Sequence, residues 1–368
     1  MIEKDLVVIG GGPAGLSACK VACEAGMNVA LFEGNFQLGG QLIKQTHKFF
    51  GSESQYAKIR GIEIAKILIS ELDETNTEVF LNATVVGMYK DNVITVYQNN
   101  KYFKIKAKAI IIATGASEKF LAFENNDLPG IYGAGAVQTL MNIHGVLPGK
   151  QVVMVGSGNI GLIVSYQLIQ AGVKVKALIE AAGKIGGYSV HASKLRRLGV
   201  PILTNTTVKR AVGEGLLEKI ITVKLDDKWE EIPGSEEEIY CDGLCISVGL
   251  SPLHQLLSMA EANMIFVNEL GGLVPLKSCD YETSLKHVYA CGDVTGIEEA
   301  SSAMVEGKIA GLMASKNAGF IHPNYNLLEN ELNNQLCVLR QGPCGEKIRC
   351  GLKKVGEALW LEKLVFLL

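Results

Sequence analysis

The sequence lacks the cysteine pairs that thiol–disulfide exchange needs. It has nine cysteines among 368 residues, yet no two of them stand three positions apart. In a Cys-x-x-Cys pair, one thiolate attacks a disulfide and the other resolves the mixed disulfide. Cys19 and Cys23 are four positions apart, as are Cys241 and Cys245. We expect both pairs to pack in the core as small apolar groups, the second pair on one face of a single strand.

Metal-ligand spacing, strong charge and long apolar runs are also missing. Six scattered histidines predict no metal site, and a formal net charge of −3 gives no reason to expect nucleic acid or an anionic membrane as a partner. The apolar end Ala358–Leu368 is too short to span a bilayer and contains Glu362 and Lys363. The first predicted strand starts almost at Met1, which leaves no room for a signal peptide. We therefore expect a cytoplasmic protein with reduced cysteines.

What the sequence does have is a strand, a glycine turn, a helix, a strand and an acid in direct succession. Hydrophobic residues make up 48% of the chain, enough for a large core and two domains. The apolar run Leu6–Ile9 leads into the turn Gly10–Gly15. A helical segment follows, and a second apolar run, Val29–Phe32, ends at Glu33. This is the G-x-G-x-x-G dinucleotide fingerprint in the context that it requires.

Each part of this motif has a physical task. Gly10 permits the tight turn, Gly12 lets the backbone approach a pyrophosphate, and Gly15 lets the helix pack closely on the strand. The helix N-terminus offers free N–H groups and the positive end of the helix dipole to the phosphates. Glu33 stands where a carboxylate can accept both ribose hydroxyls. A glycine turn without a ligand is the alternative, and the complete succession of elements argues against it.

Polar residues after Glu33 are candidates for contacts with a ring system. Gly40 and Gln41 begin a segment whose backbone can approach a flat ligand, and Lys44 and His47 follow in a polar run. An ordinary surface loop is the alternative for Lys44 and His47. We assign no other catalytic candidates.

The next stretch, residues 77–112, alternates apolar and polar residues in short pieces. It predicts a small antiparallel meander of three pieces, 79–86, 93–98 and 102–112, which feeds the buried strand Ala109–Ile112. That strand ends in Ala113, Thr114 and Gly115, where a glycine again suits close approach to a nucleotide.

The succession of strand, glycine turn, helix, strand and acid then occurs a second time. Gln151–Val155 is a predicted buried strand, Gly156–Gly161 is a second G-x-G-x-x-G, and the strand Val173–Ile179 ends at Glu180. A second meander closes on Val248 and Gly249. The chain therefore contains two copies of one nucleotide-binding plan.

A later segment of the chain is predicted to complete the first of these two copies. Val288–Ala290 is a predicted strand that delivers Gly292 and Asp293 into a turn, and a helix follows from about Ala300. Asp293 can accept a sugar or ribityl hydroxyl, and a plain turn or cap aspartate is the alternative.

With these motifs together, the chain resembles the two-dinucleotide-domain flavoproteins. The resemblance implies an α/β fold with two Rossmann-like, three-layer ββα domains, the second inserted into the first as in thioredoxin reductase, each with a small meander. It implies an FAD-binding domain of residues 1–115 plus 251–325, an NAD(P)-binding domain of residues 116–250, and a tail, residues 326–368, that docks a partner. Thioredoxin reductase itself carries a Cys-x-x-Cys between residues 130 and 150, where this chain has no cysteine.

The resemblance also implies which residues hold the cofactors. Those implied for FAD are Gly10, Gly12, Pro13, Ala14, Gly15, Glu33, Gly40, Gln41, Val85, Val86, Ala113, Thr114, Gly115, Gly292 and Asp293. Those implied for the second nucleotide are Gly156, Gly158, Asn159, Ile160, Gly161, Glu180 and Gly249. Lys44 and His47 are the candidates for the flavin edge. Glu180 pairs with a free 2′-hydroxyl and repels a 2′-phosphate, and only Lys184 follows it as a cation, so NAD is favoured over NADP. The alternative is that a structural adenine nucleotide occupies the second site.

A closer resemblance is to the α-type subunit of multicomponent amine and amino-acid dehydrogenases. Relatives of that kind include sarcosine oxidase, dye-linked proline dehydrogenase, opine oxidase and hydrogen cyanide synthase subunits. The resemblance implies a hetero-oligomer with a second flavoprotein. Many relatives hold an iron–sulfur cluster on four C-terminal cysteines, whereas this tail has three, Cys337, Cys344 and Cys350. A cluster in such a complex is therefore expected on a separate small subunit.

Three functions remain open at this point. The first is an electron-transfer subunit that passes electrons between a partner dehydrogenase and NAD or another acceptor. The second is a stand-alone NAD(P)H reductase of a small redox carrier. The third is a non-catalytic scaffold in which both nucleotides are structural. An obligate subunit would bury the apolar end of the tail against its partner, and a free reductase has little need of it.

Overall fold

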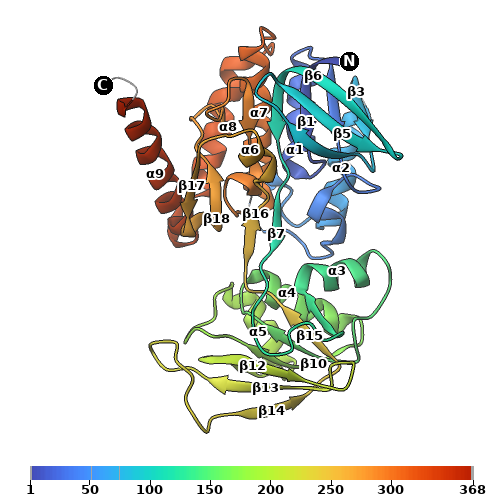
Figure 1. Ribbon diagram of the computed structural model, residues 1–368, viewed down its shortest axis with the longest axis vertical. Coiled ribbons are helices and arrows are strands. Elements are labelled where there is room, and N and C mark those ends of the chain that lie inside the picture. Colours follow the sequence, from blue (N-terminus) through green and yellow to red (C-terminus); the bar gives the residue numbers. More distant parts are fainter. Residues whose placement is uncertain (1, 51, 74, 366–368) are drawn as a thin grey trace. The chain divides into compact units, whose positions relative to one another are not determined.

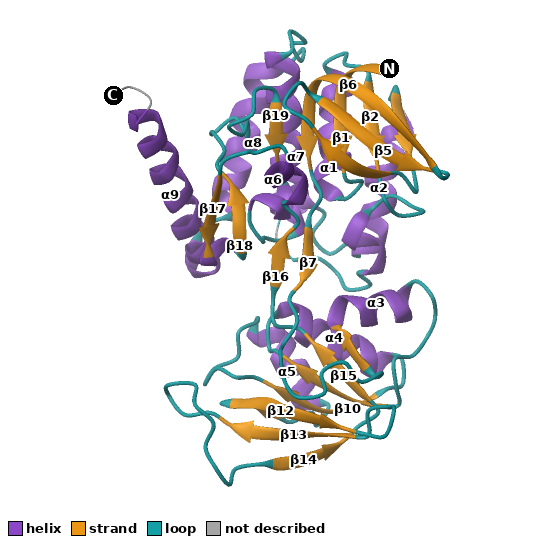
Figure 2. Ribbon diagram, viewed as in Figure 1, coloured by secondary structure: helices purple, strands orange, loops and turns teal. Residues whose placement is uncertain are grey.

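The chain folds into two compact α/β units (Figures 1 and 2). The structure, a computed structural model, describes residues 2–50, 52–73 and 75–365, and of residues 344 and 362–365 only the backbone. Unit 1 comprises Met1–Ser117 and Ser251–Leu368, and unit 2 comprises Glu118–Leu250. The predicted α/β fold class, with mixed parallel and antiparallel sheets, is confirmed.

The elements of unit 1 come from both ends of the chain. The first segment contains β1 (Ile2–Ile9), α1 (Pro13–Glu24), β2 (Val29–Phe32), η1 (Gly40–Lys44), η2 (Glu53–Gln55), α2 (Gly61–Asp73), β3 (Thr77–Phe80), β4 (Thr84–Met88), β5 (Val93–Gln98) and β6 (Lys101–Ile112). The second contains α6 (Gln255–Met259), β17 (Met264–Val267), η3 (Asn268–Leu270), β18 (Gly272–Pro275), β19 (Val288–Ala290), η4 (Gly292–Thr295), α7 (Ala300–Asn317), α8 (Tyr325–Leu339) and α9 (Gly342–Val365). Two short strands, β7 (Ala116–Glu118) and β16 (Leu250–Pro252), pair with each other.

The long strand β6 belongs to two sheet regions of unit 1 at once. Its C-terminal half lies parallel to β1 and β19, and the parallel order continues through β2 to β3. Its N-terminal half pairs antiparallel with β5, which pairs with β4. The prediction that residues 79–86 form one piece of the meander was wrong, because β3 joins the parallel sheet and Asn82, at φ 49°, lies in the turn before β4.

Close helix packing positions the start of α1. A Cβ on Gly307 of α7 would lie 2.0 Å from the carbonyl oxygen of Ala14, and a Cβ on Gly311 would lie 2.5 Å from that of Ala18. These two glycines therefore let α7 pack backbone to backbone against α1. Tyr289 and other large buried side chains fill the same core.

Unit 2 repeats the arrangement on a smaller scale. Its elements are β8 (Ile131–Gly133), α3 (Ala134–Asn142), β9 (Gln151–Val155), α4 (Asn159–Gln170), β10 (Lys174–Ile179), α5 (Ser189–Arg197), β11 (Ile202–Leu203), β12 (Thr206–Val212), β13 (Lys219–Lys224), β14 (Glu237–Tyr240) and β15 (Gly243–Ile246). A parallel sheet has the order β11-β10-β9-β15-β8, and β12, β13 and β14 form an antiparallel sheet. Figure 2 shows these three antiparallel strands side by side.

The predicted single strand that carried Cys241 and Cys245 is broken. Cys245 lies in β15, whereas Cys241 lies between β14 and β15, which belong to different sheets. The break falls at Asp242, whose carboxylate accepts the N–H groups of Lys150 and Gln151 at 2.7–2.9 Å. Both thiols are buried in the core, as predicted.

Two helices extend unit 1 at its C-terminal end. In Figure 1, α9 runs beside β17, and its residues Ile348, Leu352 and Val355 join a small apolar core with η3 and β18. Within the described part of the chain, no helix combines the length and apolar composition needed to cross a bilayer. Residues 366–368 of the predicted docking tail and the side chain of Cys344 lie outside the described residues.

Candidate functional site

In unit 1, four parallel strands end together at one edge of the sheet. Ile9 of β1 is in register with Phe32 of β2 and Ile112 of β6, and Ile112 is in register with Ala290 of β19. Ligands of open parallel sheets bind outside this carboxyl edge. The residues that follow the four strands are therefore brought together, and they include Gly10, Glu33, Ala113, Thr114, Gly115, Gly292 and Asp293.

Of the three G-x-G-x-x-G glycines in the turn after β1, the fold itself requires Gly10 and Gly15 but not Gly12. A Cβ on Gly10 would lie 2.2 Å from the carbonyl oxygen of Ala113, and φ of Gly10 is 109°. A Cβ on Gly15 would lie 1.9 Å from the carbonyl oxygen of Gly10. Among the described residues, a Cβ on Gly12 would meet only the Cα of Gly40, at an ordinary 3.8 Å. The missing side chain at Gly12 thus leaves open space beside the start of α1.

The open space adjoins an uncapped helix start. Pro13 is the first residue of α1, and the described first turn of this helix has no acidic residue and no side-chain cap. Helix α3 differs, because there the N–H of Gly135 donates to the Glu118 carboxylate at 2.6 Å. The N-terminus of α1 therefore keeps its positive dipole end available for an anion.

Glu33 is buried, with 7% of its surface exposed, and it is held in place by the backbone around it. Its Oε2 accepts the N–H of Gly11 at 2.8 Å, and its Oε1 accepts both the backbone N–H and the side-chain amide of Asn35 at 2.8 Å. A carboxylate offers about four acceptor positions, so these three hydrogen bonds from described residues leave room for another donor. The carboxylate is thus oriented and can still accept a hydroxyl.

Asp293 lies in the turn η4 that follows β19. The N–H of Glu298 donates to its Oδ1 at 3.3 Å. Burial raises the pKa of Asp293 to about 7, the N–H of Glu298 opposes this, and the nearby carboxylates of Glu306 and Glu298 raise the pKa further. Gly292, at φ 73°, donates its N–H to Glu306 at 2.8 Å. Asp293 is therefore a carboxyl group at the sheet edge whose pKa lies close to neutral pH.

The remaining residues expected near the first nucleotide lie in η1, in the loop that follows it and in β4. Gly40 has an internal reason to be glycine, because a Cβ there would lie 2.7 Å from the Cα of Gly12. Gln41 is exposed and Lys44 half-buried in η1, and the ring of His47 stacks on Phe49 with centroids 5.7 Å apart. A bulge interrupts the pairing of β4 with β5 between Val85 and Gly87, so that Val86 has no partner in that register.

Unit 2 has the same construction at the carboxyl edge of its parallel sheet. Val155, Ile179 and Ile246 end their strands in register. A Cβ on Gly156 would lie 2.1 Å from the carbonyl oxygen of Ser247, and a Cβ on Gly161 would lie 2.1 Å from that of Gly156. Gly158 again differs, since no described atom lies within 4 Å of its Cβ position. Asn159 and Ile160 are the first two residues of α4. Gly249, at φ 109°, lies between β15 and β16.

Glu180 is oriented as Glu33 is. Its Oε2 accepts the backbone N–H of Ser157 at 2.8 Å and the Ser157 hydroxyl at 2.5 Å, and its Oε1 accepts the N–H of Ala182 at 2.9 Å. The Ser157 hydroxyl also accepts the N–H of Gly186 at 2.9 Å. Sequence reasoning missed Ser157, and its place between the two glycines of G-S-G was the available signal.

A second group missed from the sequence lies beneath the Asp293 turn. It consists of charged and polar side chains buried between η4, α7 and α8, namely Lys277, Tyr281, Glu298, Glu306 and Arg340. These residues are far apart in sequence and belong to no motif, so no sequence signal pointed to them.

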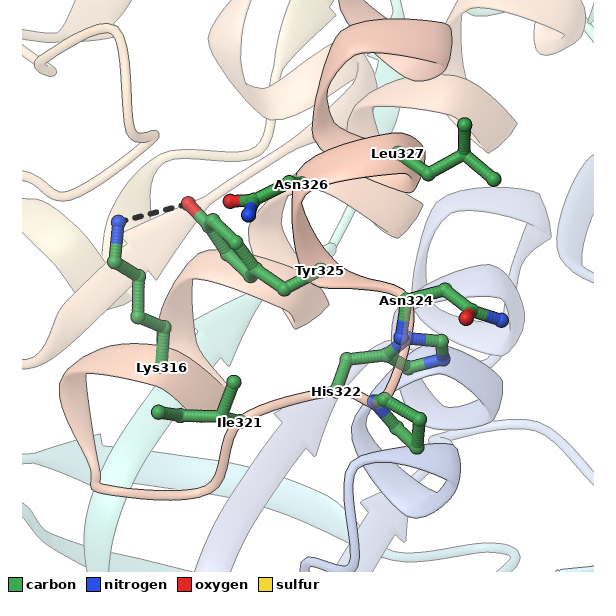
Figure 3. Close-up of a pocket in the computed structure, with 8 residues that line it drawn as sticks. Lys316, Ile321, His322, Asn324, Tyr325, Asn326 and Leu327 are labelled. Atoms are coloured by element: carbon green, nitrogen blue, oxygen red, sulfur yellow. Dashed lines mark hydrogen bonds between the residues drawn. The ribbon is translucent and has the colours of Figure 1, made fainter.

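A surface pocket at the far end of α7 is separate from these edges. Lys316, His322 and Tyr325 are among the residues that line it, and Figure 3 shows the Lys316 ammonium donating to the Tyr325 hydroxyl at 2.9 Å. Sixteen residues of helix, about 24 Å, separate Lys316 from the start of α7 beside the Asp293 turn. The pocket is therefore no part of the site at the sheet edge.

The two cysteines of the tail whose side chains are described are exposed and lie on different helices. Cys337 is in α8 and Cys350 is in α9. Within the described residues, no group of three or more histidine, cysteine or acidic side chains is placed to hold a metal ion.

Comparison with known proteins gives relatives over most of the chain. The alpha chain of sarcosine oxidase from Corynebacterium sp. (strain P-1) is 27% identical over 336 residues, which are 87% of this chain and 33% of that protein. An opine oxidase subunit from Rhizobium meliloti is 25% identical over 339 residues, which are 86% of this chain and 63% of that protein. The chain thus spans less than two thirds of the length of either relative. The resemblance to amine and amino-acid dehydrogenase subunits is confirmed at this level.

Solved structures and family profiles agree with this result. Thioredoxin reductase from T. acidophilum superposes with a TM-score of 0.71 at 24% identity, covering 86% of this chain and 99% of that chain, which shows a shared fold. The profile described as pyridine nucleotide-disulphide oxidoreductase matches residues 4–307. Both glycine turns and both oriented glutamates lie inside that range. The chain therefore belongs to the pyridine nucleotide-disulphide oxidoreductase family, and it is an oxidoreductase of the flavoprotein type.

Proposed function

We propose that this chain is an FAD-dependent electron-transfer subunit that exchanges electrons between a partner amine or amino-acid dehydrogenase and NAD. One observation carries the proposal. In each unit, the middle glycine of the turn is the one that the fold itself leaves open, and an oriented glutamate with spare acceptor capacity stands beside it. Two such edges in one chain fit two dinucleotides better than one.

In this proposal unit 1 holds FAD. The pyrophosphate lies over Gly12 and the N-terminus of α1, where N–H groups and the helix dipole favour negative charge. Glu33 accepts a hydroxyl of the adenosine ribose, and Asp293 makes a hydrogen bond with the ribityl chain. Val86 lies at the bulge of β4, the strand that ends the sheet order, and this position suits backbone contact with the adenine.

Unit 2 holds NAD in the same way, with Gly158 and the start of α4 at the pyrophosphate. Glu180 accepts a ribose hydroxyl, because its carboxylate keeps an acceptor position beside its bonds to Ser157 and Ala182. A 2′-phosphate would place negative charge against this carboxylate, and Lys184 is the one cation in the loop that follows. NAD is therefore preferred over NADP.

The protein's contribution to the chemistry is binding and orientation. When bound, the flavin accepts or donates a hydride or single electrons. The chain fixes the dinucleotides by their phosphates and riboses and thereby sets where the flavin ring lies. Lys44 and His47, at the end of η1 and shortly after it, are the candidates to place positive charge near the flavin edge.

The partner in this proposal is a second flavoprotein subunit, and a small iron–sulfur subunit where the complex contains a cluster. Relatives named as subunits of sarcosine and opine oxidases support a hetero-oligomer. The tail supports the same idea, because α9 leaves Trp360 63% exposed and Leu361 57% exposed. Apolar side chains that a free protein exposes on a helix are suited to burial in an interface.

The test is an anaerobic titration of the purified chain with NADH and, separately, NADPH, followed by the flavin absorbance. Bleaching by NADH at concentrations where NADPH has little effect is the expected result. A flavin that dithionite reduces and neither nucleotide reduces would contradict the NAD assignment and favour a structural second nucleotide. Purification of the untagged chain from its source then separates a complex-bound protein, which brings a flavoprotein partner, from a stand-alone reductase, which elutes alone.

A further inference from the structure

A buried arginine of the C-terminal helices binds two glutamates of the main fold. Arg340 is the C-cap residue directly after α8, and its side chain is largely buried, with 12% exposed. Its Nε lies 3.1 Å and 3.0 Å from the two carboxylate oxygens of Glu298, and its Nη2 lies 2.5 Å from Glu298 Oε1 and 2.5 Å from Glu306 Oε1. One guanidinium thus ties together two carboxylates from different segments, which is the geometry that arginine offers and lysine does not.

Both glutamates also contact the turn that carries Asp293, Glu306 through its carboxylate and Glu298 through its backbone. The second oxygen of Glu306, Oε2, accepts the N–H of Gly292 at 2.8 Å and the hydroxyl of Thr295 at 3.3 Å. Glu298 donates its backbone N–H to Asp293 itself. Gly292 and Thr295 are the first and last residues of η4. Arg340 therefore acts on both ends of the turn, each time through one intervening residue.

The charges in this cluster balance only when Arg340 is present. Lys277 is the other buried cation, and its Nζ lies 3.7 Å from Glu306 Oε1 and 3.5 Å from the centre of the Tyr281 ring. Tyr281 donates its hydroxyl to Glu306 at 3.1 Å. Without Arg340, two buried carboxylates would share one lysine, and removing one partner of a buried pair leaves an uncompensated charge. Glu306 would then lose the guanidinium that holds its Oε1 while its Oε2 accepts the N–H of Gly292.

We propose that Arg340 is a positioning residue for the FAD site, so that the C-terminal helix α8 is part of cofactor binding and not only of a docking segment. The inference rests on the proposed role of Asp293 in FAD binding. By thermodynamic reciprocity, if the docked α8 strengthens FAD binding, then bound FAD stabilises the docking of α8 by the same factor. Loss of cofactor therefore loosens the tail.

The experiment compares two tail variants of the full chain, Arg340→Met and Lys354→Met. Lys354 pairs with Glu269 of η3 at 2.5 Å, so K354M breaks a tail ion pair that does not touch the turn. FAD is titrated into each apoprotein, and the dissociation constant is read from quenching of flavin fluorescence. We expect R340M to weaken FAD binding on the order of 10-fold to 100-fold, K354M to leave it within about twofold, and Arg340→Lys to restore part of the loss.

The wild-type chain supplies a second measurement, which holds even if R340M does not fold. Hydrogen exchange at the backbone amides of Leu336–Arg340 is compared with and without FAD. Slower exchange with FAD supports the inference, and equal exchange overturns it. An R340M chain that folds and binds FAD as tightly as wild type also overturns the inference. If Asp293→Ala weakens FAD binding in that case, the proposed function still stands. A wild-type apoprotein that binds no FAD would overturn the proposed function together with this inference.

Discussion

The hydroxyl of Ser157 donates to the carboxylate of Glu180 over 2.5 Å, and the backbone N–H of the same serine donates to the same oxygen over 2.8 Å. The glycine turn of unit 2 therefore holds the acid that follows the next strand. In unit 1, Gly11 holds Glu33 with its N–H alone. Both turns therefore orient a glutamate by donating hydrogen bonds to its carboxylate, one in unit 1 and two in unit 2. The protein's own groups thus fix the carboxylate in each site.

Replacing Glu180 with glutamine should change the nucleotide preference of the chain. In the proposed NAD site, the amide removes a charge-assisted hydrogen bond to the ribose, worth roughly 1.5–3 kcal/mol, so the dissociation constant for NADH should rise about 10-fold or more. The loss of negative charge should weaken NADPH binding less or strengthen it. Anaerobic titration of E180Q with both nucleotides measures this. The exposed Glu230→Gln of the same unit is the control, and an unchanged NADH-to-NADPH ratio in E180Q would contradict the assignment.

Alanine at the middle and last glycines of the first turn should have opposite effects. Gly12 has φ −82° and an open Cβ position, so Gly12→Ala should fold with stability equal to wild type or up to about 1 kcal/mol higher, and should lose FAD. In Gly15→Ala the Cβ would meet the Gly10 carbonyl oxygen at 1.9 Å, which should lower the stability of the apoprotein. Thermal unfolding without cofactor, together with FAD titration, separates the two. Equal FAD affinity in G12A and wild type would show that no ligand occupies the space.

Many of the helices and strands, and both glycine turns, could be predicted from the sequence because the sequence patterns that specify them are local. Gln151–Val155 is a strand as predicted, and α7 begins at Ala300 as predicted, since apolar runs and turn residues within a few positions specify such elements. The glycine motifs likewise predicted where strands end. Two predictions that depended on long strands were wrong, at residues 79–86 and at Cys241. In both places a turn residue, Asn82 or Asp242, divides the apolar pattern between two sheets, and periodicity within one segment does not show which sheet each piece joins.

The cluster around Arg340 could not be predicted at all. Its members come from residues 277 to 340, and in the sequence each alone is an ordinary charged or polar residue that belongs to no motif. Their burial depends on α8 returning to the turn η4, which is a property of the tertiary structure. Gly40 illustrates the reverse case, because the sequence correctly marks it as special but the reason lies in its contact with the Gly12 backbone.

Alkylation of the native chain should leave flavin reduction intact. Burial raises the pKa of the Cys241 and Cys245 thiols to about 12 and that of Cys291 still further, so these thiols are protonated and unreactive near neutral pH. Iodoacetamide at pH 8 should therefore label the exposed Cys279, and with it Cys337 and Cys350. Peptide mapping and an NADH titration of the labelled chain measure both outcomes. Loss of reduction on labelling would show that a thiol takes part after all.

The last prediction concerns the pH dependence of stability without FAD. Burial, opposed by the N–H of Glu298 and reinforced by Glu306 and Glu298, raises the pKa of Asp293 from 3.8 to about 7 in the folded chain. Between about pH 4 and pH 7 the folded state keeps a proton that the unfolded state has released, so the free energy of unfolding falls as pH rises. The contribution is fully present below about pH 4 and lost above about pH 7, and at 1.36 kcal/mol per pKa unit it is at most about 4 kcal/mol.

Asp293→Asn removes this titration and should flatten the curve. The measured quantity is the difference in the free energy of unfolding between apoprotein variants and wild type, from denaturant titrations at pH values from 4 to 8. We expect the stability of D293N relative to wild type to rise with pH across this window, because wild type loses stability there and the amide does not. The exposed Asp91→Asn of the same unit should run parallel to wild type. Parallel curves for D293N and wild type would mean that Asp293 is already ionised in the folded chain, and that in the proposed FAD site it would act only as a hydrogen-bond acceptor.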